Sequence, residues 1–247
     1  MCLIVVGWKT DPHHPLVVAA NRDELFVRPT APLAWWDDAP DILAGRDLKG
    51  GGAWLGITRT GRFAALTNYR DPVHMRDDTP SRGHLVADFL RGNEAPGGYL
   101  HRIKDAAQAC NGFNLLVADE RELWWHSNVN GETRRLEPGI YGVSNHLLDT
   151  PWPKLLDAKT RFAQAAADPE RLFALLRDET RHPDEALPNT GVGLAREREL
   201  SAIFVATPVY GTRSSAVLLR DASGKIRFDE RTWQAGGIAG PRICISS

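Results

Sequence analysis

The pattern of apolar and polar positions begins with an uninterrupted apolar run at residues 2–8, a turn-forming stretch, and a second apolar run at residues 16–20. Short apolar runs bounded by Pro, Asp and Gly predict buried strands, and two such runs joined by a turn predict a hairpin. A second hairpin is predicted at residues 53–58 and 63–68. The same reasoning predicts six later strands, at residues 114–118, 123–127, 139–144, 202–207, 214–219 and 225–232.

Helical spacing of apolar residues marks four further segments, at residues 81–90, 99–110, 152–167 and 169–176. Ser81 is a candidate N-cap for the first, and prolines precede or open the last two. Because the strands arrive as hairpins and do not alternate with helices, we expect antiparallel sheets and an α+β class. Two sheets, each covered on one face by helices, predict a four-layer αββα sandwich. No linker interrupts the chain, so a single domain over residues 1–247 is expected.

Composition narrows the function classes. The 247 residues carry a net charge of -1 without a block of like charges, which does not favour a nucleic-acid or acidic-membrane partner. The three cysteines, at positions 2, 110 and 244, lack metal-ligand spacing, and we expect a reducing compartment with Cys110 and Cys244 as core thiols. The first apolar run is too short to span a membrane and lacks a basic leader region. A cytoplasmic protein without a membrane span is therefore predicted.

Cys2 carries the most distinctive chemistry in the sequence. Its small side chain permits removal of the initiator methionine, which would leave a thiol and a free α-amine on one residue. An α-amine with a pKa of about 7.7–8.0 can act as the base that activates such a nucleophile. The simpler alternative is that Cys2 is only a small apolar residue at the start of a strand.

Four polar residues near strand ends fit this chemistry: Asp23, Asn68, Asn145 and Arg213. Attack on a carbonyl builds negative charge on oxygen, which the Asn145 side chain and the Asn68 backbone could stabilise. Asp23 could orient the terminal amine. Arg213 could bind a substrate carboxylate or support the nucleophile. We expect much of Cys2 to be thiolate near neutral pH, because its own amine and Arg213 favour that form.

Several motifs carry a resemblance along nearly the whole chain. They are Met1-Cys2, Asn21-Arg22-Asp23-Glu24, Trp54-Leu55-Gly56, Thr67-Asn68-Tyr69-Arg70, Ser81-Arg82-Gly83, Tyr141-Gly142-Val143-Ser144-Asn145 and Tyr210-Gly211-Thr212-Arg213-Ser214-Ser215. In this order they resemble the NRDE family, also called the transport and Golgi organisation family. That family is tied to lipid and haem handling, and Glu24 is particular to its pattern.

A more remote resemblance is to the N-terminal nucleophile hydrolases that cleave bile salts and penicillin V. Those enzymes use an N-terminal cysteine, an aspartate after a second strand, two asparagines and a late arginine. The residues that match them in order are Cys2, Asp23, Asn68, Asn145 and Arg213. The resemblance implies the αββα sandwich and this catalytic set. One position departs, because Ala20 stands where the acylases carry an arginine.

The sequence therefore predicts an N-terminal-cysteine hydrolase that acts on a small amide or related acyl substrate through a thioester intermediate. Arg22, Trp54 and Tyr69 are the candidates for substrate contacts, and no metal or cofactor is predicted. The alternative is a non-enzymatic carrier on the same fold, which would use Cys2 to bind haem or would handle lipid.

Overall fold

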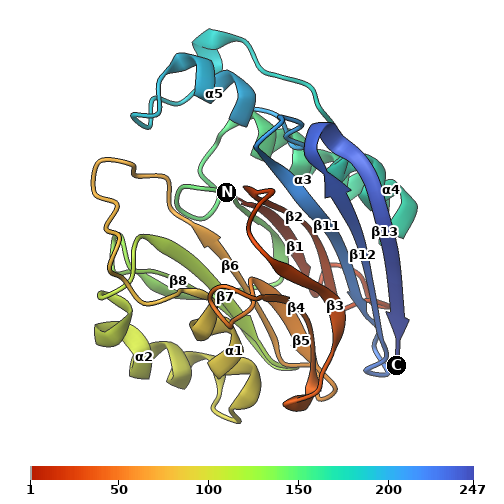
Figure 1. The fold of residues 1–247 in the computed structure, drawn as a ribbon. Helices are drawn as coiled ribbons and strands as arrows, with labels where there is room; N and C mark the ends of the chain where they lie inside the picture. Colours follow the sequence, from red (N-terminus) through yellow and green to blue (C-terminus); the bar gives the residue numbers. More distant parts are fainter. Residues whose placement is uncertain (1) are drawn as a thin grey trace.

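The computed structural model describes residues 2–247, which form two antiparallel sheets packed face to face (Figure 1). The first sheet has six strands in the order β10-β1-β2-β11-β12-β13. Its strands are β1 (Cys2–Trp8), β2 (Leu16–Leu25), β10 (Gly139–Val143), β11 (Tyr210–Arg220), β12 (Ile226–Gln234) and β13 (Ile238–Ser246).

The second sheet has seven strands in simple sequence order from β3 to β9. They are β3 (Thr30–Trp36), β4 (Ala39–Asp47), β5 (Leu55–Thr58), β6 (Phe63–Asn68), β7 (Phe113–Ala118), β8 (Leu123–Ser127) and β9 (Thr133–Leu136). Each strand pairs antiparallel with the next, as expected for strands joined by short turns.

Helices cover the outer face of each sheet. The pair α1 (Gly83–Arg91) and α2 (Pro96–Ala107) packs on the second sheet, where Phe89 and Leu100 meet Phe113 in one buried cluster. The pair α3 (Pro153–Ala165) and α4 (Pro169–Leu176) packs on the first sheet, and α5 (Leu194–Leu200) follows later in the chain. These layers confirm the predicted αββα sandwich (Figure 1). Among residues 2–247, no helix is long and apolar enough to cross a membrane.

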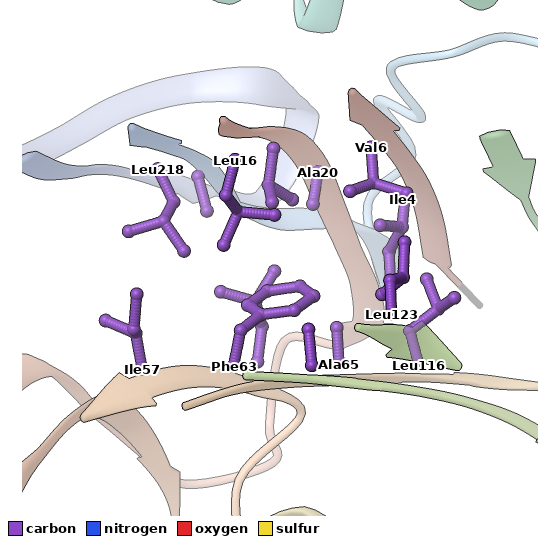
Figure 2. Packing of buried hydrophobic residues seen from close by; sticks show 14 of the residues in the cluster. Ile4, Val6, Leu16, Ala20, Ile57, Phe63, Ala65, Leu116, Leu123 and Leu218 are labelled. Carbon is purple, nitrogen blue, oxygen red and sulfur yellow. The ribbon is translucent and has the colours of Figure 1, made fainter. Parts of the chain in front are cut away.

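The main core lies between the two sheets (Figure 2). Side chains alternate along a strand, so Ile4 and Val6 of β1 enter this inter-sheet core, whereas Leu3 and Val5 pack under the helices. Because β1 is covered on both faces, all seven of its residues are buried. This double cover explains why the sequence shows an unbroken apolar run there.

The strand register brings several chain segments to one end of the sheets. Cys2 at the start of β1 pairs with Arg22 near the end of β2, and β10 pairs with β1 so that its last residues approach the same point. The carboxyl terminus, at the end of β13, lies at the opposite end of the sandwich (Figure 1). The end of the sandwich that contains Cys2 is called the Cys2 end below.

Several predicted elements differ from the structure. Residues 30–47 form the β3–β4 hairpin, which the prolines and paired tryptophans concealed. Residues 202–207 are not a strand: residues 202–205 are buried, Ala206 makes one isolated bridge, and β13 is the third late strand instead. Ser81 does not cap α1, whose N-cap residue is Arg82 and has no side-chain cap bond. Cys110 is buried as predicted, but Cys244 is exposed because β13 is the edge of its sheet.

Candidate active site

Cys2 is the first residue of β1, and its main chain is held between β2 and β10. Its side chain is 7% exposed, and the Ser144 hydroxyl donates a hydrogen bond of 3.0 Å to the Cys2 carbonyl oxygen. Burial raises the pKa of the Cys2 thiol, and the backbone N–H of Asp23 acts in the opposite direction. Ser144 directly follows β10, and Cys2 pairs with Arg22 of β2, so the two strands beside β1 both contribute a contact. The start of β1 is therefore fixed between its neighbours.

The Cys2 thiol lines a cleft of about 390 Å³. The walls of this cleft, called the Cys2 cleft below, come from the ends of β2, β4 and β6 and from the segment before α1. Polar and charged residues dominate them, including Arg22, Asp23, Glu24, Arg28, Arg46, Asp47, Lys49, Asn68, Asp77, Ser81 and Arg82. Trp54 and Leu66 supply apolar wall. The cleft is thus suited to a small polar ligand more than to a purely apolar one.

Arg22 faces the cleft directly opposite Cys2 in the β1–β2 pairing. It shares the inter-sheet side of β2 with Ala20, two residues earlier, because side chains alternate along a strand. Ala20 stands where the acylases carry an arginine. Arg22 can therefore place a guanidinium on the same face of the sheet. Its polar contacts are long, at 3.8 Å to Glu24 and 3.5 Å to the Thr30 hydroxyl, so its charge is only loosely neutralised.

Asp23 points to the other side of β2, toward the helices, and is 3% exposed. Its Oδ1 accepts a hydrogen bond of 2.7 Å from the Thr212 hydroxyl, and its carbonyl accepts one of 3.1 Å from the Tyr210 hydroxyl. Burial raises the pKa of the Asp23 carboxyl, while the positive charges of Lys154 and Arg70 and the Thr212 bond act in the opposite direction. A carboxylate at this place can act electrostatically on a positive charge at the start of β1.

Asn68 and Asn145 meet through a direct hydrogen bond. The Asn145 Nδ2 donates to the Asn68 carbonyl at 2.9 Å, and the Arg70 backbone N–H donates to the Asn145 carbonyl at 2.8 Å. Asn68 lines the Cys2 cleft, whereas Asn145 is fully buried beside it. A side-chain amide has two N–H donors, and the Asn68 carbonyl takes one of them.

Two predicted site residues lie elsewhere. The Arg213 guanidinium donates to the carbonyls of Leu25 and Arg28 in the turn after β2, and Arg213 does not line the cleft. Tyr69 lines a neighbouring cleft of about 520 Å³ and packs against His146, with the two rings tilted by 39° and their centroids 4.9 Å apart. The predicted support of the nucleophile by Arg213 is therefore not realised, because the arginine is used to hold the β2–β3 turn.

The expected thiolate character of Cys2 also needs correction. Burial raises the pKa of the Cys2 thiol, and the charge of Asp23 raises it further. Arg22, and not Arg213, is the arginine that opposes this rise. The neutral thiol is consequently favoured, and a base is needed to take its proton during any reaction.

Sequence reasoning missed four charged residues near this site. Arg82 lines the Cys2 cleft and donates to the Gly112 carbonyl at 3.0 Å. Arg70 and Glu197 form a buried ion pair of 2.6 Å, with side chains 5% and 3% exposed. Lys154 is buried nearby, in the first turn of α3. A lysine at that position opposes the helix dipole, which was the sequence signal for Lys154, and Arg70 and Arg82 stand in two of the family motifs.

No group of three His, Cys, Asp or Glu side chains within residues 2–247 could hold a metal ion. The chemistry of the Cys2 end is that of a thiol, carboxylates, amides and guanidinium groups.

Comparison with solved structures defines the class of fold. An N-acylethanolamine-hydrolyzing acid amidase ortholog from Caenorhabditis elegans superposes with a TM-score of 0.52 at 11% sequence identity, covering 88% of this chain and 92% of that one. A cysteine-to-alanine mutant of the conjugated bile acid hydrolase from Clostridium perfringens gives a TM-score of 0.52 at 8% identity, covering 99% and 92%. The protein thus has the fold of the N-terminal nucleophile hydrolases.

The sequence places the chain within a particular family. Residues 1–235 match the Transport and Golgi organisation 2 family. The bovine (Bos taurus) and human Transport and Golgi organization protein 2 homologs are 37% and 36% identical over 259 residues, covering 94% of this chain and 93% of each relative. The Drosophila melanogaster Transport and Golgi organization protein 2 is 30% identical over 265 residues, covering 94% and 92%. The chain belongs to the Transport and Golgi organisation 2 family.

Proposed function

We propose that this protein is an N-terminal-cysteine hydrolase acting on a small amide or related acyl substrate. One observation carries the proposal: Cys2 lines a cleft together with Arg22, Asp23 and Asn68, and Asn145 is hydrogen-bonded to Asn68 beside it. The two solved neighbours are named as an amidase and a hydrolase, which supports the same reaction class.

The reaction proceeds in two steps. The α-amine of Cys2 takes the thiol proton as the sulfur attacks the substrate carbonyl carbon, which forms a C–S bond and an oxyanion. The oxyanion collapses, the C–N bond breaks, and the leaving amine takes the proton from the α-ammonium group. Water then attacks the thioester with the same amine as base, the carboxylate product leaves, and the thiol is restored.

The oxyanion has two candidate side-chain donors, in addition to the Asn68 backbone that the sequence predicts. The second N–H of Asn145 Nδ2 is one, because the Asn68 carbonyl takes only the first. Arg22 is the other, since its guanidinium lines the cleft opposite Cys2 with only long contacts to Glu24 and Thr30. Groups already in place stabilise charge that develops during the reaction, without reorganisation.

The walls of the cleft limit the substrate. The volume of about 390 Å³ suits a small acyl compound, and Trp54 offers one aromatic surface. Arg22 and Arg82 both line the cleft without a carboxylate in close contact, so a substrate with a negatively charged group is favoured. A panel of acyl amides with and without a carboxylate tests this, and hydrolysis by a Cys2→Ala variant would remove the proposal.

The mechanism requires that the working protein begin at Cys2. We expect intact-mass measurement of active preparations to give the mass without Met1, because only then is the α-amine on the same residue as the thiol. A preparation that is fully active while it retains Met1 would contradict the proposed base.

A second function is a carrier that binds haem or lipid on the same fold. The raised pKa of the Cys2 thiol favours this alternative, because a buried neutral thiol needs no catalytic role. Thiolate ligation of haem should shift the Soret band on titration, and the shift should vanish in Cys2→Ala. We expect no such Cys2-dependent shift. Its appearance, together with an inactive amide panel, would favour the carrier.

A further inference from the structure

Lys154 is a buried positive charge in an unfavourable place. Its side chain is 3% exposed, and its Nζ donates a hydrogen bond of 2.9 Å to the carbonyl of Leu200, at the end of α5. Within residues 2–247, no carboxylate lies at ion-pair distance from it. It is also the second residue of α3, where the positive end of the helix dipole disfavours a cation. Burial of a charge without a close partner is costly, so a use for this charge is expected.

The surroundings of Lys154 connect it to the Cys2 end. Asp23 faces the helices from β2, on the side of the sheet that α3 covers, and the charges of Asp23 and Cys2 both act on Lys154. Other charged or titratable groups face this region from the segment after β6, from α5, from the segment before α5 and from β11. They are Arg70, Glu197, His182 and Tyr210.

Most of these neighbouring charges are neutralised locally. Arg70 forms its 2.6 Å ion pair with Glu197, whose other oxygen accepts from the backbone and hydroxyl of Thr190. His182 lies 3.6 Å from Asp157. Among residues 2–247, Lys154 is left as the cation without an acidic partner at ion-pair distance, and the acidic groups that act on its charge are Asp23, Cys2 and then Glu197.

We propose that Lys154 is a positioning residue whose positive charge, held on the helix side of β2, makes the proton of the Cys2 thiol easier to remove and keeps the α-amine neutral. The proposal rests on the function proposed above for Cys2. Asp23 alone would favour the thiol over the thiolate and the ammonium over the amine, which makes the thiol proton harder to remove and leaves the amine unable to accept it. A nearby cation favours the thiolate and the neutral amine. The charge of Lys154 therefore opposes the effect of the Asp23 carboxylate on these two protonation equilibria.

The titration of Lys154 itself supports this role. Burial, followed by the charge of Arg70, lowers its pKa to about 8. The ammonium is therefore charged in the neutral range, where the cysteine must react, and loses its charge at higher pH. Cys2 reactivity should then rise less steeply above that pH than it would beside a permanent cation.

The pH dependence of Cys2 alkylation tests the proposal without a substrate. Wild type, Lys154→Met and Lys154→Arg are prepared in a Cys244→Ser background, because Cys244 is exposed and would consume the reagent. Intact mass confirms that each protein begins at Cys2. The rate of iodoacetamide labelling of Cys2 is followed by peptide mass spectrometry between about pH 6 and pH 9.

We expect Lys154→Met to slow Cys2 labelling at neutral pH about tenfold, the effect of a one-unit rise in the pKa of the thiol. Lys154→Arg should restore it, and it should label faster than wild type at about pH 9, where lysine has lost its charge and arginine has not. Identical profiles in folded wild type and Lys154→Met would overturn the proposal. If Lys154→Met does not fold, equal rates of Lys154→Arg and wild type at high pH would overturn it.

This readout separates the two proposals. A lysine-dependent profile in a protein that hydrolyses nothing would remove the hydrolase and keep the role of Lys154. If wild type hydrolyses a substrate but Lys154→Met has the same pH profile of Cys2 alkylation as wild type, the hydrolase proposal stands and the role of Lys154 is removed.

Discussion

Cys2→Ala is expected to reduce hydrolysis of any acyl-amide substrate by about 10⁴–10⁶-fold, the loss seen when the nucleophile of a covalent mechanism is removed. Alanine is small enough that the methionine is still cleaved, so the α-amine is kept and only the thiol is lost. Cys2 is 7% exposed at the edge of the cleft, and the loss of one sulfur atom there should leave the fold intact. Steady-state kinetics on the best substrate of the panel measures the effect.

The matched control for this prediction is Cys110→Ala. Cys110 is also buried, at 5% exposure, but lies in the cluster under α1 and α2, away from the Cys2 cleft. The Cys110→Ala variant should lose some stability and keep the turnover of the wild type. Equal activity of Cys2→Ala and Cys110→Ala would mean that the thiol at position 2 is not the nucleophile.

Asp23→Asn is expected to lower turnover on the order of a hundredfold or more, because the carboxylate that orients the amine loses its charge but keeps its shape. The fold should persist, since the Thr212 hydroxyl can donate to an amide oxygen as it does to Oδ1. The same change should raise the rate of Cys2 alkylation, because the charge of Asp23 raises the pKa of the thiol. Slower turnover combined with faster alkylation is not what a misfolded protein would give.

Asp229→Asn is the control for the Asp23 variant. Asp229 is fully buried in the same sheet, where it pairs with Arg227 at 2.7 Å, outside the Cys2 cleft. Its substitution should affect stability and neither kinetic measurement. If Asp23→Asn leaves both turnover and alkylation unchanged, with folding confirmed by circular dichroism, Asp23 serves only as a residue of the strand end.

The layers of the fold were predictable because strand and helix periods are local. The runs at residues 2–8 and 63–68 are buried strands, and the prediction of the helix at residues 169–176 agrees with α4. The β3–β4 hairpin was not recognised because Pro29, Pro32 and the two tryptophans obscure its alternation. The apolar segment at residues 202–207 was wrongly predicted to be a strand. A short apolar run can be buried equally well without forming a strand.

The site was predictable only in part. Cys2, Asp23, Asn68 and Asn145 lie at or near the ends of strands whose register brings them to one end of the sheets, and strand ends can be read from sequence. Arg213 could not be placed in this way, because a long side chain on β11 can turn to the cleft or to the β2–β3 turn, and it does the latter. Arg82 and Lys154 come from helix starts, and their approach to the site depends on the packing of layers.

The central claim, that Cys2 forms a covalent intermediate, is tested most directly by trapping the acyl group. Protein that begins at Cys2 is mixed with the acyl-amide panel and with an activated acetyl ester, then quenched in acid so that the amine is protonated and cannot take the acyl group from sulfur. Peptide mass spectrometry should find the acyl mass on Cys2 and on neither Cys110 nor Cys244. Turnover of a substrate without any acyl group on Cys2, or with the same turnover in Cys2→Ala, would contradict the account.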